Sequence, residues 1–254
     1  MRLATFNILH GRSPADDRVD PSALADAVRS LDADVQALQE VDRNQPRSDH
    51  ADLTTIAAEA MGAVDHEFVA ALAGSPGATW SAATGAEQPD AASYGVALLS
   101  RHPVSSWQIV RLPALPFAAP MWFRGSRVPT LVRDEPRVAV AAQVETPLGR
   151  ITVVNTHLSF LAYWNVRQLR RLVAALAPAT RPLVLMGDLN MGPERAVATT
   201  RMRPLAAHPT FPVDEPREQI DHVLVDGALE PTGSCARLLP LSDHRALVVD
   251  LAVA

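Results

Sequence analysis

Acidic, amide and imidazole side chains recur in this chain at the ends of short apolar runs. Asn7 closes the first such run, and Asp188 and Asn190 follow another at residues 183–187. In layered α/β proteins, active sites form at strand ends, where the connecting loops converge. The sequence therefore predicts that these side chains share one cleft, although they are spread over the whole chain. The full set is Asn7, Glu40, His157, Asp188, Asn190, Asp221, Asp243 and His244.

This mixture of side chains suits the hydrolysis of a phosphate ester. The ester is negatively charged and repels hydroxide, and a bound divalent cation offsets that repulsion by bridging phosphate oxygens. Magnesium prefers oxygen ligands and keeps several waters, so one or two carboxylates are enough to hold it. Glu40, Asn7 and Asp243 offer such oxygens. We therefore predict a Mg²⁺ site, in which Mn²⁺ can substitute.

The remaining polar residues suit the proton transfers and charge changes of that reaction. A carboxylate or imidazole must deprotonate or orient the attacking water, and Asp188 and His244 both suit this task. Donors must neutralise the charge that grows on the phosphoryl oxygens, and His157, Asn190 and protonated His244 can do so. A neighbouring carboxylate keeps a histidine protonated, and Asp221 could be that partner. The choice of general base between Asp188 and His244 stays open.

Helical and strand patterns alternate along the chain, which predicts an α/β layered fold in a single domain over residues 1–254. Asp20 and Pro21 are typical of a helix start. Apolar spacing predicts helices near residues 21–31, 52–61 and 169–176. Strands are predicted at residues 2–8, 35–41, 95–100, 138–144, 151–155, 183–186, 219–225 and 247–252. A hairpin turn at residues 146–149 joins two of these strands.

Two stretches rich in proline or small residues, 74–93 and 112–136, are predicted to be loops. The second stretch carries the aromatic residues Phe117, Trp122 and Phe123. These residues could form a lid, a wedge that contacts lipid, or a folded plug without a function. The plug is the preferred interpretation.

The composition favours a globular enzyme over a basic nucleic-acid binder. Hydrophobic residues make up 48% of the chain, and the net charge of -5 lacks the basic surplus that is usual in non-specific nucleic-acid binders, although a local basic groove is still compatible with it. All 23 basic residues are arginine, which excludes Schiff-base lysine chemistry and a Walker P-loop. The single cysteine, Cys235, excludes an internal disulfide and a cysteine-based zinc site. No signal peptide precedes the first strand and no apolar run approaches a membrane span, so we expect a cytoplasmic protein.

Seven short motifs occur in one order along nearly the whole chain. They are residues 5–7 (TFN), 38–41 (LQEV), 94–101 (YGVALLSR), 155–158 (NTHL), 187–190 (GDLN), 220–223 (IDHV) and 242–244 (SDH). In this order they resemble the endonuclease/exonuclease/phosphatase superfamily, which includes deoxyribonuclease I, neutral sphingomyelinases and inositol-polyphosphate 5-phosphatases. No single motif is specific, but the seven together are highly specific.

The resemblance implies a deoxyribonuclease I-like, four-layer α/β/β/α sandwich, in which helices flank two packed mixed sheets. It implies that Glu40 is the principal metal ligand, with Asn7 and Asp243 nearby. It further implies that Asp188 positions or deprotonates the attacking water and that Asn190 contacts the phosphate.

The resemblance also implies how the histidines are arranged. His157 with Asp221, and His244 with Asp243, would complete the phosphate site. Abasic-site endonucleases carry a tyrosine where this chain has His157. The resemblance therefore favours the deoxyribonuclease, sphingomyelinase and phosphatase branches of the superfamily.

Several further residues are assigned from their positions. Tyr94 and Arg137 begin strands near the expected cleft and are assigned to substrate binding, although a packing role and a structural ion pair are equally consistent with them. His222 follows Asp221 within a strand and should face away from the site. The segment 210–212 resembles a family segment that shapes the floor of the site, but it is interpreted as packing. Among the histidines outside the motifs, His10 is the strongest candidate for a role in the site.

Three functions follow, in order of preference. The first is a metal-dependent hydrolase of a phosphomonoester or phosphodiester in a small molecule or lipid head group. The second is a nuclease acting on DNA or RNA, which requires a basic groove formed from Arg12, Arg43, Arg47 and Arg124. The third is an inactive binding module, which is least favoured because every ligand and both histidines are present. No protein partner is implied.

Overall fold

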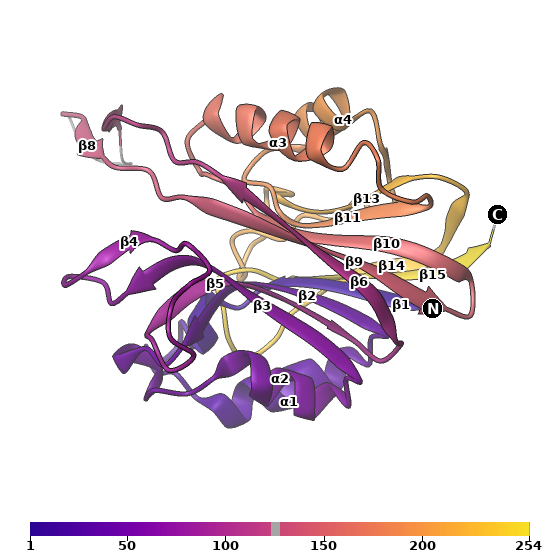
Figure 1. Ribbon diagram of the computed structural model, residues 1–254, viewed down its shortest axis with the longest axis horizontal. Coiled ribbons are helices and arrows are strands. Elements are labelled where there is room, and N and C mark those ends of the chain that lie inside the picture. The colour runs from indigo at the N-terminus through magenta and orange to yellow at the C-terminus, as the bar shows by residue number, and fades with distance from the viewer. Residues whose placement is uncertain (123–127, 254) are drawn as a thin grey trace.

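The computed structural model describes residues 1–122 and 128–253 and contains two β-sheets packed face to face (Figure 1). The first sheet consists, in order across it, of β14 (Leu229–Arg237), β15 (Ala246–Val253), β1 (Arg2–Asn7), β2 (Val35–Arg43), β5 (Ser93–Ser100), β3 (Asp65–Gly74) and β4 (Trp80–Ala82). The second consists of β12 (Arg203–Pro204), β13 (Asp221–Asp226), β11 (Leu183–Asp188), β10 (Gly149–His157), β9 (Arg137–Thr146) and β6 (Val104–Leu112). A separate hairpin is formed by β7 (Ala119–Met121) and β8 (Thr130–Val132).

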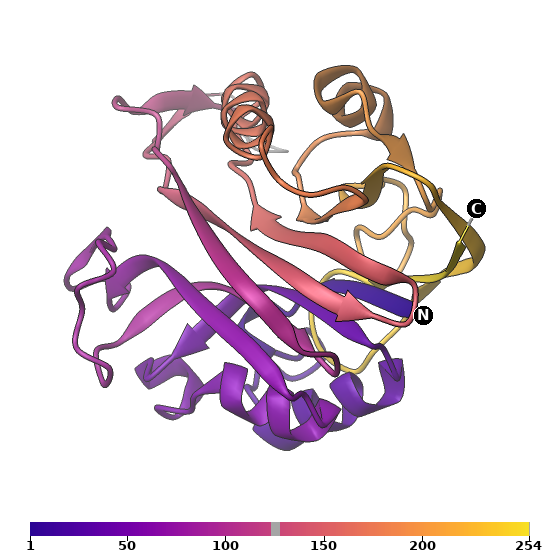
Figure 2. The same cartoon turned by 45° about the vertical axis from the view of Figure 1, so that its right-hand side comes forward.

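Helices cover the outer face of each sheet (Figures 1 and 2). The helices α1 (Pro21–Leu31) and α2 (Leu53–Met61) lie on the first sheet, and α3 (Trp164–Ala175) and α4 (Pro193–Thr200) lie on the second. Two single 3₁₀ turns, Leu9–Gly11 and Pro46–Ser48, connect elements of the first half. The order of layers is therefore helix, sheet, sheet, helix, and the predicted four-layer sandwich is confirmed.

Local sequence explains why these elements form. At the start of α1, the side chain of Asp20 accepts a hydrogen bond from the backbone N–H of Ser22, which caps the helix. Leu24, Val28 and Leu31 then place one apolar face against the first sheet. The central strands of both sheets are buried on two faces, so they consist of nearly continuous apolar runs.

One polar side chain connects the two sheets within this apolar interior. Asn155 on β10 is fully buried, and its Nδ2 donates to the backbone carbonyl oxygens of Leu38 at 2.8 Å and Ala97 at 2.7 Å. Its Oδ1 accepts from Gln39 Nε2 at 2.7 Å. Since buried polar groups are costly unless paired, this network fixes how the sheets are placed against each other directly beneath the strand ends that carry the site.

Strand register brings site residues together at one end of the sandwich. In the second sheet, His157 pairs with Asp188, and Asp188 pairs with Asp221. In the first sheet, Asn7 at the end of β1 pairs with Gln39, next to Glu40. Residues that are far apart in the sequence therefore lie at neighbouring strand ends.

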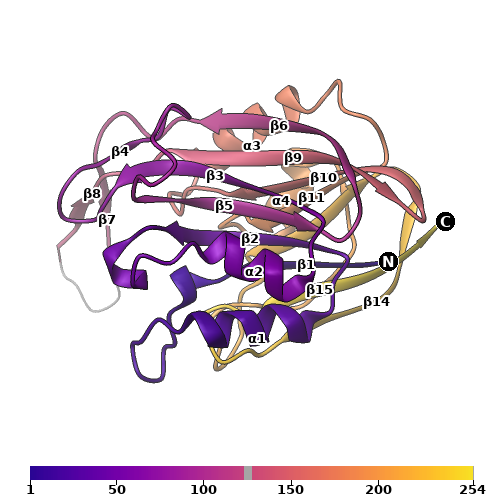
Figure 3. The same ribbon diagram turned by 60° about the horizontal axis from the view of Figure 1, so that its bottom comes forward.

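The predicted helices and strands are confirmed, and several elements are additional to them. The sequence analysis did not identify β3, β6, β14 and α4. The two stretches predicted as loops also contain short strands: β4 lies in the first, and β7 and β8 lie in the second. Figure 3 places β7 and β8 at the same end of the molecule as β4. Within the described part of the chain, no helix has the length and apolarity needed to cross a lipid bilayer.

Candidate active site

Glu40 projects into a pocket from a bulge in β2. The register between β2 and β5 shifts between Gln39 and Val41, and Glu40 there has a φ of +55°. This left-handed conformation is uncommon outside glycine, and bulges of this kind re-aim a side chain next to active sites. The bulge therefore turns a half-buried carboxylate into the pocket.

Asn7 joins the carboxylates of the two sheets. Its Nδ2 donates to Glu40 Oε1 at 3.0 Å and to Asp188 Oδ2 at 3.1 Å. Its Oδ1 accepts a hydrogen bond from the backbone N–H of Leu9 at 3.1 Å. The amide thus fixes the separation of the two acids and has its own orientation fixed by the backbone.

Glu40 has the chemical properties of a ligand for a divalent cation. Burial raises its pKa, and the hydrogen bond from Asn7 and the charges of Arg137 and His244 only partly oppose this. Among the described residues, no arginine or histidine forms an ion pair with Glu40. A buried carboxylate without a cationic partner is costly, and a bound cation would remove that cost. Glu40 and Asn7 therefore fit a hard divalent ion, and Asp243, whose side chain is 43% exposed, has its Oδ1 3.9 Å from His244 Nε2.

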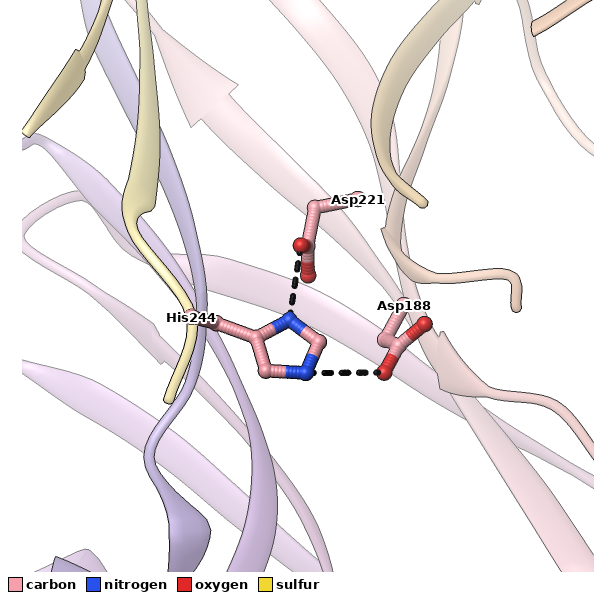
Figure 4. A group of neighbouring side chains, drawn as sticks. All are labelled: Asp188, Asp221 and His244. Carbon is pink, nitrogen blue, oxygen red and sulfur yellow. Dashed lines mark hydrogen bonds and ion pairs between the residues drawn. The ribbon is translucent and has the colours of Figure 1, made fainter. Parts of the chain in front are cut away.

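Asp188 lies at the end of β11, and its carboxylate points toward the ring of His244 (Figure 4). Several further donors surround it. Its Oδ1 accepts from the backbone N–H of Asn190 at 2.9 Å. Its Oδ2, which accepts from Asn7, also lies 3.5 Å from His157 Nε2 and 3.9 Å from His244 Nε2. Burial and the nearby carboxylate of Asp221 raise the pKa of Asp188 to about 7, although these donors oppose the shift. A carboxylate with such a pKa is well matched to accept a proton near neutral pH.

His244 is held as an imidazolium by Asp221. His244 Nδ1 lies 2.9 Å from Asp221 Oδ2, which also accepts from Thr210 Oγ1 at 2.6 Å (Figure 4). Burial alone would lower the pKa of His244, but the charges of Asp221, Asp188 and Asp243 and the hydrogen bond that the ring donates to Asp221 raise it to about 10. Nε2 therefore presents a proton toward the pocket.

The two acid–histidine pairs implied by the sequence resemblance are corrected by this arrangement. The partner of His244 is Asp221, because Asp243 Oδ1 lies 3.9 Å from Nε2 and forms no bond to Nδ1. Asp221 is thus the hydrogen-bond partner of His244, and it forms no hydrogen bond or ion pair with His157. The reason is register, since Asp221 lies one strand farther from His157 than Asp188 does.

His157 differs from His244 in its charge. The Nδ1 atom of His157 lies 3.3 Å from NH1 of Arg137. The other terminal nitrogen of this guanidinium, NH2, forms an ion pair with Glu135 at 3.5 Å. Burial and the charge of Arg137 hold the pKa of His157 well below its usual range, so the ring is neutral. Its Nε2 lies 3.2 Å from Asn190 Nδ2 and 3.5 Å from Asp188 Oδ2, so the ring lies between Arg137 on one side and Asn190 and Asp188 on the other.

These side chains line one pocket of about 460 Å³ between the two sheets. Arg137 and Tyr94, the two residues assigned to substrate binding, are 5% and 7% exposed and both contribute to the lining. Asn7 and Asp221 lie behind the lining and hold Glu40 and His244 in place. The predicted residues on the surface of the pocket are Glu40, Tyr94, Arg137, His157, Asp188, Asn190 and His244.

Residues 4–244 match the sequence profile of the Endonuclease/Exonuclease/phosphatase family. The chain belongs to this family. Members of the Endonuclease/Exonuclease/phosphatase family hydrolyse phosphate esters and generally depend on a divalent metal, in agreement with the acidic pocket described above. No curated protein matches the chain.

Solved structures share the fold of this family member. An endonuclease/exonuclease/phosphatase from Beutenbergia cavernae has a TM-score of 0.73 and 22% identity, covering 100% of this chain and 72% of its own. A mannosyl-6-phosphatase from Bacteroides thetaiotaomicron has a TM-score of 0.63 and 16% identity, with 99% of each chain covered. The human nocturnin catalytic domain has a TM-score of 0.63 and 19% identity, covering 100% of this chain and 94% of its own.

Two residues that the sequence analysis interpreted as packing belong to the site of this family member. Thr210 holds Asp221, and the ring of Phe211 lies 5.0 Å from the ring of His244 and lines the pocket. The resemblance of residues 210–212 to a segment of the site floor was the available signal. His222, as predicted, faces away and contacts the Met191 carbonyl oxygen at 2.8 Å. His10 lies outside the catalytic pocket, and burial lowers its pKa to about 4.

By proximity alone, a metal ion could also be held by Asp188, Asp221 and His244, whose ligand atoms lie within 4.8 Å of one another. However, a protonated imidazole has no lone pair to offer a metal. The Oδ2 atom of Asp221 is already used by His244 and Thr210. The charges therefore favour proton transfer among these three residues and a cation at Glu40.

The Asp221–His244 pair predicts a specific titration. In metal-free protein, replacement of Asp221 with Asn should lower the pKa of His244 from about 10 toward or below its usual range, because the largest charge that opposes burial is removed and only Asp188 and Asp243 still oppose it. NMR titration of the His244 ring measures this pKa, and Asp243→Asn is the control with a smaller expected shift. An unchanged pKa in the Asp221 variant would contradict the assignment.

The same pair predicts how stability depends on pH. The pKa of His244 is raised in the folded state above its unfolded value of about 6.5, so its contribution to the free energy of unfolding is complete below pH 6.5. That contribution is lost as the pH rises from 6.5 to about 10. Urea unfolding of the wild type and of His244→Gln should be measured across this pH range. The free energy of unfolding should fall with rising pH in both proteins, and the fall should be smaller in His244→Gln.

Proposed function

We propose that the protein is a Mg²⁺-dependent phosphoesterase that hydrolyses a phosphomonoester or phosphodiester of a small molecule or lipid with water. The supporting observation is that one pocket combines an unpaired carboxylate, Glu40, a carboxylate with a pKa near neutrality, Asp188, and two cationic groups, His244 and Arg137. Cations suited to a phosphate thus lie beside carboxylates suited to a metal and to a water molecule.

In this proposal, Glu40 and Asn7 hold the ion, with Asp243 nearby. When bound, Mg²⁺ neutralises charge on the phosphate and stabilises the leaving oxygen. Asp188 orients the attacking water and accepts its proton. Of the two candidate bases, Asp188 is preferred because His244 already carries its proton at neutral pH.

The remaining residues bind and polarise the phosphate. The His244 imidazolium donates a hydrogen bond from Nε2 to a phosphoryl oxygen, and Asp221 keeps it charged. Neutral His157 and the amide of Asn190 lie on the same side of Asp188 and contact each other, and they supply further polar groups to the phosphate site. The buried guanidinium of Arg137 adds positive charge to the pocket.

The arginines required for a nuclease groove are mostly engaged within the protein. Arg12 pairs with Asp17, Arg47 pairs with Asp42, and Arg43 lies over the ring of Phe68. Arg124 lies outside the described residues. These contacts favour a compact substrate over a long nucleic acid.

Hydrolysis assays test the proposed function. The protein is incubated with p-nitrophenyl phosphate, bis-p-nitrophenyl phosphate and supercoiled plasmid DNA, each with Mg²⁺, Mn²⁺ or EDTA. We expect metal-dependent cleavage of at least one p-nitrophenyl ester, and loss of that cleavage in Glu40→Ala. Efficient nicking of the plasmid without cleavage of either small ester would instead support the nuclease.

A further inference from the structure

A wide apolar groove of about 770 Å³ lies beside the catalytic pocket. One wall is formed by residues 115–122 and the other by residues 160–167. Phe117, Trp122 and Tyr163 expose 66%, 65% and 79% of their surfaces. Trp122 is therefore not part of a folded plug, which corrects the sequence interpretation, and Phe123 lies outside the described residues. Exposed apolar surface of this extent typically marks a binding site.

The groove and the catalytic pocket share one lining side chain. Phe160 lines both cavities and follows His157 by three residues along the chain. Asp134 fixes the two walls to each other, because its Oδ1 accepts from Ser159 Oγ at 2.5 Å and its Oδ2 accepts from the Leu115 backbone N–H at 2.9 Å. A ligand whose phosphate lies beside His157 can therefore extend past Phe160 into the groove.

Hydrogen bonds hold the wall formed by residues 160–167 in place. The indole Nε1 of Trp164 and the amide Nε2 of Gln168 both donate to the Pro113 carbonyl oxygen, at 3.0 Å and 3.1 Å. Arg167 lies over the Trp164 ring, 5.2 Å from its centroid. Because the indole N–H of Trp164 is already hydrogen-bonded, this residue contributes the apolar surface of its ring to the groove.

An unfavourable backbone conformation contributes to the same wall. Tyr163 has a φ of +70°, which a bulky residue rarely adopts. Its ring remains largely exposed and receives the guanidinium of Arg195 at 5.8 Å. Strained residues that persist at a surface often serve a binding site, and here the strain places an aromatic ring at the rim of the groove.

We infer that this groove binds the alkyl chain of an amphiphilic phosphate ester whose phosphate lies in the catalytic pocket. The inference rests on the proposed function and names its substrate as lipid-like. The position of the groove beside the pocket favours this occupant over a second protein chain, because Phe160 lines both the groove and the cavity whose charged groups would hold the phosphate. The cavity is also within the usual size of small-molecule sites.

A homologous pair of esters tests the inference. Methyl and octyl p-nitrophenyl phosphate share one reacting group and differ in chain length. Both are titrated into the protein by calorimetry in EDTA, with the octyl ester below its critical micelle concentration, and both are then assayed with Mg²⁺. Each methylene removed from water contributes roughly fourfold in affinity, so the octyl ester should bind at least about 100-fold more tightly, with a parallel gain in kcat/KM.

Two matched variants test where the alkyl chain of the ester binds. Phe117→Ser should reduce the octyl-to-methyl ratio about tenfold, whereas Leu238→Ser, which removes an apolar side chain that is 63% exposed at another site, should leave the ratio unchanged. Thermal unfolding of both variants verifies that they are folded.

The outcomes separate the inference from the proposed function. Equal binding of the two esters by the wild type, or equal loss of the ratio in both variants, would overturn the inference. Self-association that depends on Phe117 without chain binding would assign the groove to a second copy and would also overturn it. Tight octyl binding without hydrolysis of either ester under Mg²⁺ or Mn²⁺ would support the groove and reject the phosphoesterase.

Discussion

Asp188→Asn is expected to lower kcat about 10³-fold while leaving the fold intact. The amide preserves the shape of the side chain and can still accept from the Asn190 backbone N–H, which lies 2.9 Å from Oδ1. It cannot accept a proton from water, and general-base catalysis typically contributes 10²- to 10⁴-fold. Steady-state hydrolysis of bis-p-nitrophenyl phosphate measures the loss, with circular dichroism as the measure of folding.

Asp226→Asn provides a matched control for this variant. Asp226 lies at the opposite end of the β11–β13 pair, where it is exposed and bound to Arg181 at 2.8 Å. The control should retain near-normal turnover. If Asp188→Asn also turned over normally, Asp188 could not be the base, and the proposed mechanism would fail.

The Asp188→Asn substitution should also change how the free energy of unfolding depends on pH. Burial and Asp221 raise the pKa of Asp188 to about 7 in the folded protein, against about 3.9 in an unfolded chain. The folded state therefore binds more protons between these values, and the free energy of unfolding falls as the pH rises through this window. Urea unfolding at pH 4.5 and pH 7.5 measures this effect. The free energy of unfolding should fall less between these two pH values in Asp188→Asn than in the wild type.

Glu40→Gln is expected to lower activity at least about 100-fold and to weaken metal binding. The neutral amide can still accept from Asn7 Nδ2 but no longer supplies the unpaired negative charge in the pocket. A metal ion contributes several kcal/mol of transition-state stabilisation, and each 1.4 kcal/mol corresponds to a tenfold change in rate. Calorimetric titration with Mn²⁺ and rate measurements at increasing Mg²⁺ should both show the defect.

Glu67→Gln is the appropriate control for the metal-ligand variant. Glu67 lies on β3 of the same sheet, is half-buried, and also has a pKa raised by burial. Its replacement should leave metal affinity and rate near those of the wild type. Equal metal affinity in Glu40→Gln and the wild type would show that Glu40 is not a ligand.

The order of the motifs was sufficient to predict the four-layer fold, but several strands depended on tertiary context. The outward positions of β6 and β14 are largely exposed, and β14 also carries Pro231, so neither has a clear alternating pattern. Both lie at sheet edges, where pairing with β9 and β15 determines their conformation. Such non-local pairing is not encoded in local periodicity.

The identity of the candidate site residues was more predictable than their pairing. Carboxylates and histidines after apolar strands identified Glu40, Asp188 and His244 from sequence alone. The Asp221–His244 contact was misassigned because it depends on how β13 aligns with the loop before β15. The exposure of Trp122 was also not predictable, because aromatic residues in a proline-rich stretch are equally consistent with packing and with a binding surface.

Reversible metal dependence of wild-type hydrolysis is the most direct test of the account. The rate of bis-p-nitrophenyl phosphate and p-nitrophenyl phosphate cleavage is measured with Mg²⁺, after removal of the ion with EDTA, and after Mg²⁺ is restored. We expect cleavage of at least one ester, loss of that activity in EDTA, and its recovery with Mg²⁺. Cleavage that continues unchanged in EDTA would contradict a metal centre at Glu40.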